Sequence, residues 1–156
     1  GRFRSYNLGM ELRISRALIA AIRAEAVAAG RDECCGLLLG DLPGERAAAT
    51  ITAIRPAANI APVPRHRFEI DPATLIAAHK AARAGGPAIL GHYHSHPAGA
   101  PVPSACDAAM ALDNGVYWLI LGDASTARAW RTEAGGALHG RFTPVALIVT
   151  DAPPIA

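Results

Sequence analysis

The stretch at residues 92–107 constrains the fold more than any other part of the sequence. It leads from an apolar run through a loop rich in proline and glycine to Ser104, a residue type that commonly caps a helix. His94 and His96 are two residues apart, so on a strand their side chains leave the same face. Asp107 then lies in the first turn of the following helix. A loop that folds back over the strand end would bring Asp107 beside the two histidines.

These three side chains have the composition of a metal site. Neutral imidazole is the commonest protein ligand for metals. Two histidines, one carboxylate and an open position make up the ligand set of a catalytic zinc site. A His-x-His pair alone is more often a strand with two polar residues that face solvent. The apolar run at 88–91 before the pair, and the loop and capped helix after it, favour the metal site here.

The stretch resembles the metal motif of the JAMM/MPN (JAB) zinc metalloproteases, in which His-x-His is followed by seven residues and then Ser-x-x-Asp. The spacing of His94, His96, Ser104 and Asp107 matches that motif completely. The family also needs a glutamate far upstream, before an apolar strand. Glu33 precedes the run Cys-Cys-Gly-Leu-Leu-Leu-Gly, as in the short single-domain prokaryotic members. Two separate motifs in the right order make the resemblance specific.

The resemblance implies a role for each of these residues. His94, His96 and Asp107 are the expected ligands of one Zn²⁺ ion per chain. Glu33 is expected to take a proton from the attacking water, and Ser104 to hydrogen-bond the carbonyl oxygen as it gains charge. General chemistry agrees, because zinc lowers the pKa of bound water to about 7. A nearby carboxylate can pass the proton to the leaving amine, and a hydroxyl can stabilise the oxyanion.

His92 departs from the family pattern, in which an apolar or aromatic residue usually stands at this position. If the strand alternates regularly, His92 shares the face of His94 and His96. Three roles stay open for it: a hydrogen-bond partner of a metal ligand, a substrate contact, or a residue at the rim of the site. A fourth metal ligand is not expected, because it would close the site to water.

The activity that the resemblance implies is hydrolysis of an amide bond by a zinc-dependent metallopeptidase or isopeptidase. Eukaryotic relatives that cut ubiquitin linkages grip ubiquitin with insertions, for which a chain of 156 residues has little room. Short prokaryotic relatives act on ubiquitin-like or sulfur-carrier proteins, and cleavage after their Gly-Gly tail is expected here. The alternative is a non-catalytic MPN-type protein-binding module, although many such modules have lost the metal ligands. A nucleoside deaminase would need His-x-Glu and Pro-Cys-x-x-Cys, which the sequence lacks.

The composition predicts one folded domain. A hydrophobic share of 51%, largely alanine, excludes a disordered chain. The net charge is only +2 and the arginines are scattered, so no nucleic-acid partner is expected. No apolar run approaches the ~20 residues of a membrane helix, and no signal peptide is evident, so no membrane partner is expected either. The oligomeric state stays open.

Three cysteines, Cys34, Cys35 and Cys106, bear on the compartment. An odd number of cysteines without a secretory signal indicates a reducing cytoplasm and not a disulfide framework. Cys34 and Cys35 are adjacent and cannot form an ordinary disulfide with each other. We interpret them as small, buried, apolar residues of a strand.

Periodicity predicts an α/β domain at residues 10–150, in which strands outnumber the three helices. We expect a three-layer structure, a mixed β-sheet flanked by helices. That expectation agrees with the JAB1/MPN fold, related to the cytidine deaminases, which the resemblance implies. Residues 1–9 are interpreted as a tag remnant or flexible extension, and 151–156 as a tail. Strands are expected at 10–15, 35–39, 48–55, 66–70, 87–93, 116–121, 127–131, 137–142 and 145–149, and helices at 15–30, 71–85 and 104–114.

Overall fold

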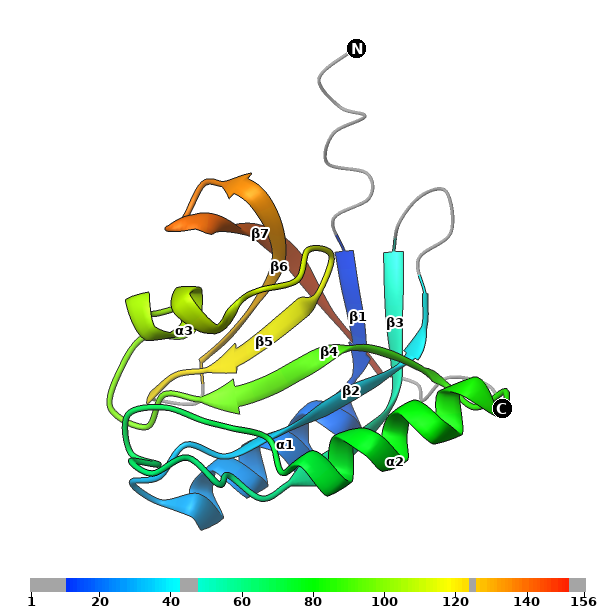
Figure 1. Cartoon of the computed structure of the whole chain (residues 1–156), viewed down its shortest axis with the longest axis horizontal. Helices are drawn as coiled ribbons and strands as arrows, with labels where there is room; N and C mark the ends of the chain where they lie inside the picture. Colours follow the sequence, from blue (N-terminus) through cyan, green and yellow to red (C-terminus); the bar gives the residue numbers. More distant parts are fainter. Residues whose placement is uncertain (1–10, 43–47, 124–125, 152–156) are drawn as a thin grey trace.

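Seven β-strands and three α-helices make up the part of the chain that the structure, a computed structural model, describes, which is residues 11–42, 48–123 and 126–151. The predictions for residues 1–9 lie outside these ranges, and so does all but the first residue of the predicted tail. The division into 1–9, 10–150 and 151–156 therefore stays a prediction. The elements in chain order are β1 (Glu11–Ser15), α1 (Arg16–Ala29), β2 (Cys35–Asp41), β3 (Ala48–Ala57), α2 (Pro72–Arg83), β4 (Ala88–Ser95), α3 (Ala105–Met110), β5 (Tyr117–Leu121), β6 (Ala127–Gly136) and β7 (Gly140–Thr150) (Figure 1).

The strands close into a barrel in the order β1-β3-β2-β4-β5-β6-β7, so the prediction of a three-layer sheet flanked by helices was wrong. The barrel closes where β7 pairs in parallel with β1, from Glu11 opposite Ala146 to Ser15 opposite Thr150. In Figure 1, β7 leaves the hairpin with β6 and crosses to the side of β1. Periodicity shows which faces of a strand are buried, but not whether the first and last strands meet.

The segment at 66–70 was predicted as a strand and is not one. Its only ladder contact is an isolated bridge between Asn59 and Ile70. The side chain of Asn59 takes the place of a partner strand, because its amide donates to the carbonyl of Arg67 at 3.1 Å and its oxygen accepts from Glu69 N–H at 3.0 Å. The alternating pattern reflects the burial of Phe68, which is 4% exposed.

Other boundaries also differ from the predicted ones, since β6, expected at 127–131, extends to Gly136. The expected strands at 137–142 and 145–149 are replaced by one strand, β7, which begins only at Gly140 and continues through Pro144. Helix α3 ends at Met110, four residues earlier than predicted. There Arg141 of β7 donates to the carbonyls of Ala111 and Asp113, at 2.9 and 3.1 Å. A distant arginine thus supplies donors to the chain just beyond the helix end.

Helices α1 and α2 begin where the sequence predicts. Ser15 caps α1, since its Oγ accepts from the N–H of Leu18 at 3.2 Å, and Gly30 ends the helix with a φ of 63°. Asp71 caps α2, and Pro72 occupies its first position. The described helices include none that is both long and apolar enough to cross a membrane.

Antiparallel pairing of β2 with β4 brings the two sequence motifs together. Cys35, at the start of β2, lies opposite His94, near the end of β4. The neighbouring residues Cys34 and Ser95 are also hydrogen-bonded to each other. The Oγ of Ser95 accepts from the N–H of Cys34 at 2.9 Å, and the N–H of Ser95 donates to the Cys34 carbonyl at 3.2 Å. Because antiparallel strands run in opposite directions, Glu33 at the entrance of one strand lies beside the histidines at the exit of the other.

Candidate metal centre and active site

The structure brings the three predicted metal ligands into one triangle. The Nε2 atoms of His94 and His96 are 3.1 Å apart. Oδ2 of Asp107 lies 3.3 Å from the first of these nitrogens and 3.2 Å from the second. The side chains of His94 and Asp107 are buried, and that of His96 is 14% exposed. Two imidazole nitrogens and a carboxylate oxygen therefore converge at the end of β4.

The spacing of these atoms fits a bound metal ion. Zinc with nitrogen and oxygen ligands at about 2.0–2.1 Å in a tetrahedron needs donor atoms about 3.4 Å apart. The observed separations of 3.1 to 3.3 Å come close to that value. Three protein donors also leave one position of a tetrahedral ion for a further ligand. The residues present therefore fit a metal ion in both donor type and spacing.

Local hydrogen bonds orient two of the three candidate ligands. Nδ1–H of His96 donates to the carbonyl of Ala100 at 2.9 Å, which leaves the lone pair of this ring on Nε2. Asp107 shares a capping box with Ser104. The N–H of Ser104 donates to Oδ2 of Asp107 at 2.9 Å, and the N–H of Asp107 donates to Oγ of Ser104 at 3.0 Å. The start of α3 thus fixes this carboxylate.

The ring of His94 is held by aromatic packing. Phe68 stacks on it with centroids 4.2 Å apart and planes 21° apart, and Trp118 meets it edge-on at 5.6 Å. Its Nδ1 atom is buried and has no hydrogen-bond partner among the described residues. Phe68 and Trp118 therefore help to orient His94, together with Asp107 at its Nε2, and the sequence motif did not indicate these two aromatic residues.

His92 lies in the same aromatic cluster, behind the triangle. Its ring centroid is 4.3 Å from that of Trp118, 5.2 Å from that of Phe68 and 6.3 Å from that of His94. Burial lowers the pKa of His92 to about 3, so the ring is neutral. Its Nδ1 atom is also buried without a partner in the described ranges. This placement favours a packing role for His92 over a contact with substrate.

The loop at 97–103 is anchored through its carbonyl groups. Prolines 97, 101 and 103 lack an N–H, so the loop has few backbone donors and is held largely through its acceptors. Three carbonyls each accept from a ring N–H, one at the base of the loop and two on the β6–β7 hairpin. The pairs are His96 with Ala100 at 2.9 Å, Trp130 with Pro101 at 3.1 Å and His139 with Pro103 at 3.0 Å. The sequence did not predict that Trp130 and His139 hold this loop. The only signal for it was that both side chains carry a ring N–H donor.

Glu33 approaches the triangle from the opposite wall. Its carboxylate and the two histidine rings offer donor atoms that all lie within 4.8 Å of one another. Glu33 is buried, and its Oε1 has no hydrogen-bond partner in the described part of the chain. Burial raises the pKa of Glu33 to about 7, opposed by attraction to His96 and assisted by repulsion from Asp107. A buried carboxylate with a raised pKa and an unpaired oxygen among the described residues suits a group that exchanges protons.

The three side chains of the triangle shift one another's pKa values. Burial alone would raise the pKa of Asp107, but hydrogen bonds with His94 and His96 outweigh it and hold the pKa below its ordinary value. Burial alone would lower the pKa of His96, but hydrogen bonds with Asp107 and the Ala100 carbonyl raise it above its ordinary value. His94 is fully buried, and burial lowers its pKa. The carboxylate is therefore ionised and His94 neutral, as metal ligands must be.

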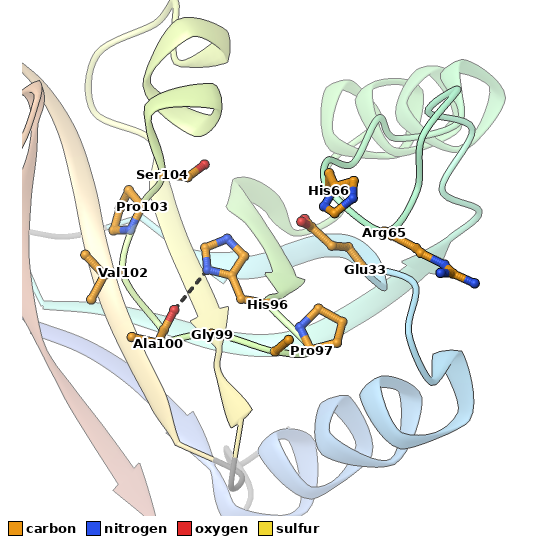
Figure 2. A pocket seen from close by; sticks show the side chains of 11 residues that line it. Glu33, Arg65, His66, His96, Pro97, Gly99, Ala100, Val102, Pro103 and Ser104 are labelled. Carbon is orange, nitrogen blue, oxygen red and sulfur yellow. Dashed lines mark hydrogen bonds between the residues drawn. The ribbon is translucent and has the colours of Figure 1, made fainter.

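A pocket of about 450 Å³ opens over His96. The 97–103 loop and Ser104 form one wall, and Glu33, Arg65 and His66 form the other. Figure 2 shows the carboxylate of Glu33 and the hydroxyl of Ser104 on opposite sides of this hollow, with His96 between them. Both predicted catalytic side chains thus face the space next to the triangle.

Known proteins share both the sequence pattern and the fold. The family model described as prokaryotic homologs of the JAB domain matches residues 15–148. A desampylase of Haloferax volcanii is 41% identical over 88 residues, which are 56% of this chain and 60% of that protein. A probable TtuB-protein conjugate cleaving protease of Thermus thermophilus is 33% identical over 99 residues, 64% of this chain and 62% of that protein. The chain therefore spans about three fifths of the length of each relative.

Two solution structures have the same architecture. A protein of Desulfitobacterium hafniense superposes with a TM-score of 0.78 at 24% identity, and a protein of Salinibacter ruber with 0.64 at 25% identity. Each alignment covers 92% of this chain and 95% of the other. These likenesses concern the fold, whereas the family model covers most of the sequence, including both motifs. The chain belongs to the prokaryotic homologs of the JAB domain.

Proposed function

We propose that this protein is a zinc-dependent peptidase or isopeptidase that hydrolyses the amide bond after the Gly-Gly tail of a ubiquitin-like or sulfur-carrier protein. The observation that carries the proposal is the triangle of His94, His96 and Asp107 with the carboxylate of Glu33 beside it, whose Oε1 has no hydrogen-bond partner among the described residues. The names of the relatives, a desampylase and a TtuB-conjugate cleaving protease, support the substrate class.

In this proposal His94, His96 and Asp107 hold the ion. When bound, zinc would supply a Lewis acid and a water whose pKa is lowered to about 7. Glu33 takes a proton from the attacking water and delivers it to the nitrogen of the leaving amine. Its pKa of about 7 suits both transfers, and its Oε1 has no competing hydrogen bond among the described residues.

Ser104 acts on the other side of the scissile bond. Its Oγ already accepts the N–H of Asp107, which turns the hydroxyl so that its proton remains available. The side chain lines the pocket, and the described chain offers no acceptor for that proton. The hydroxyl can therefore donate to the carbonyl oxygen of the substrate as this atom becomes an oxyanion.

The proposal is tested first by metal content, measured by elemental analysis on wild type and Asp107→Ala side by side. We expect about one zinc per chain in wild type and a loss of zinc in the variant, because one of three ligands is gone. The zinc-loaded protein should then cleave a reporter fused behind a Gly-Gly-tailed carrier. A folded wild type that takes up no metal after zinc is added would refute the enzyme and favour a protein-binding module.

The compartment also belongs to the proposal. All three cysteines have free thiols in the structure. Free thiols persist in a reducing environment, so we assign the protein to the cytoplasm.

A further inference from the structure

A row of three hollows continues from the active-site pocket along α1. The first, of about 360 Å³, shares Arg65 and Pro97 with the pocket. The second, of about 200 Å³, shares Gly30 and Pro97 with the first. The third, of about 610 Å³, shares Arg23 with the second and ends against β6 and β7. Because each hollow shares lining residues with the next, the three lie in a row, and we call them together the arginine trough.

Four arginines, spaced along its length, line the trough. They are Arg65, Arg31, Arg23 and Arg128. The ion pairs found among residues 11–42, 48–123 and 126–151 involve none of them. The Nε atom of Arg23 is buried without a hydrogen-bond partner in those ranges. No carboxylate among the described residues therefore pairs with these four arginines, which leaves their positive charge available to a partner.

The guanidinium of Arg128 is held in place. It lies over the ring of Trp130, 4.5 Å from the centroid. Such stacking orients an arginine while its N–H groups stay available to a partner. The far end of the trough thus presents a cation that is already ordered.

Negative charge is nearly absent from the trough. Glu33, at the end next to the triangle, is the only carboxylate among the described residues that line the pocket and the trough. The whole sequence has 15 basic and 13 acidic residues, so composition alone does not explain this separation of charge. The surface therefore favours a partner rich in carboxylates.

The trough also carries apolar side chains between the arginines. Val27, which is 79% exposed, and Val149, which is 39% exposed, stand at its walls. No Phe, Tyr or Trp is among the described lining residues of the trough, so nucleic-acid bases would find no ring to stack on. Mixed apolar and cationic lining is typical of a surface that receives an acidic protein.

We propose that the arginine trough docks a carboxylate-rich face of the globular body of the substrate protein while its tail enters the pocket. This inference rests on the proposed function, since it concerns the same substrate. The trough joins the pocket directly, so a body bound along α1 can place its C-terminal tail at the triangle. Charge complementarity would speed encounter and fix the orientation of the body.

The test compares charge reversals inside and outside the trough. Arg31→Glu and Arg128→Glu change its two ends, and Arg83→Glu, on α2, makes the same change of net charge elsewhere. Three substrates share one scissile bond: an acidic Gly-Gly-tailed ubiquitin-like fusion, the same fusion with surface Asp and Glu changed to Asn and Gln, and the tail alone as a short peptide. KM and kcat are measured at about 0.05 M and about 0.5 M salt, because salt screens such charges.

We expect each trough reversal to raise KM for the acidic fusion about tenfold at low salt and much less at high salt. The kcat values, the peptide, the neutralised fusion and Arg83→Glu should show little change. Equal KM values for wild type and both trough variants at both salt concentrations would overturn the docking proposal, even with cleavage confirmed. Weaker binding of a single-stranded oligonucleotide, without an effect on the acidic fusion, would also overturn it and assign the trough to nucleic acid.

Failure of the proposed function gives a different result. The dissociation constant of the acidic fusion is measured by fluorescence anisotropy on the same variants. If zinc-loaded wild type cleaves none of the three substrates while this constant still rises in Arg31→Glu and Arg128→Glu, docking is supported and hydrolysis is refuted.

Discussion

Ser104 has two roles that substitutions can separate. Its Oγ accepts the N–H of Asp107 at 3.0 Å, and its own N–H donates to Asp107 at 2.9 Å, so it caps α3 and orients a candidate metal ligand. Its hydroxyl proton has no acceptor in the described chain and lies at the wall of the pocket (Figure 2). The first role concerns stability, and the second concerns the transition state.

The expected magnitudes differ for the two roles. Ser104→Ala removes both, which costs about 1 kcal/mol of stability for the cap. It also lowers kcat about 100- to 1,000-fold, or about 2.7–4 kcal/mol, for one oxyanion donor. Ser104→Gly loses only a few tenths of a kcal/mol as a cap, but loses the donor entirely. Its φ of −83° and ψ of 170° suit glycine as well as serine. Ser104→Thr keeps the hydroxyl and serves as the matched control.

The assay measures kcat on a Gly-Gly-tailed fusion, zinc content and thermal unfolding for the same four preparations. We expect Ala and Gly to lose turnover equally while Gly retains most of the stability. If kcat instead follows stability, with Gly close to wild type and Ala slow, Ser104 is a cap alone and the oxyanion role is refuted. Unchanged zinc content in all variants would show that Asp107 still holds its position.

Three further predictions follow from the site. Glu33→Gln should retain zinc and lower kcat about 100- to 10,000-fold, because the substitution removes a proton acceptor and no metal ligand. Elemental analysis and a turnover assay on the same preparation check this prediction. A loss of zinc would instead show that Glu33 is a metal ligand. Zinc affinity should rise as pH increases through and above about 6.5, the ordinary pKa of histidine, because the pKa of His96 is raised and binding must displace the proton of this ligand. Chelator competition across this range measures it, and a flat profile would contradict it. Phe68→Leu should cost about 1 kcal/mol and weaken zinc binding about tenfold, since Phe68 stacks on His94 at 4.2 Å. Thermal unfolding measures the loss of stability, and titration with zinc measures the loss of affinity. If Phe68→Leu binds zinc as tightly as wild type, the orientation of the His94 ring does not depend on Phe68.

The elements that the sequence predicts well are those set by local interactions. Ser15 and Gly30 mark the ends of α1, and Asp71 the start of α2, because capping bonds join residues a few positions apart. The candidate ligands followed from residue spacing and from a resemblance with two motifs. Their roles stay predictions, although the structure brings their donor atoms within 3.3 Å of one another.

By itself, the sequence determined the caps, the buried strands and the set of residues offered to a metal. Only the tertiary structure decided that β7 meets β1 and closes the barrel, that Asn59 replaces a strand beside residues 66–70, and that Phe68 orients His94. It also decided that four scattered arginines share one trough. Each of these features joins residues far apart in the chain. Such pairings depend on which of many compact arrangements buries the most apolar surface and satisfies the most polar groups, and periodicity does not report that choice.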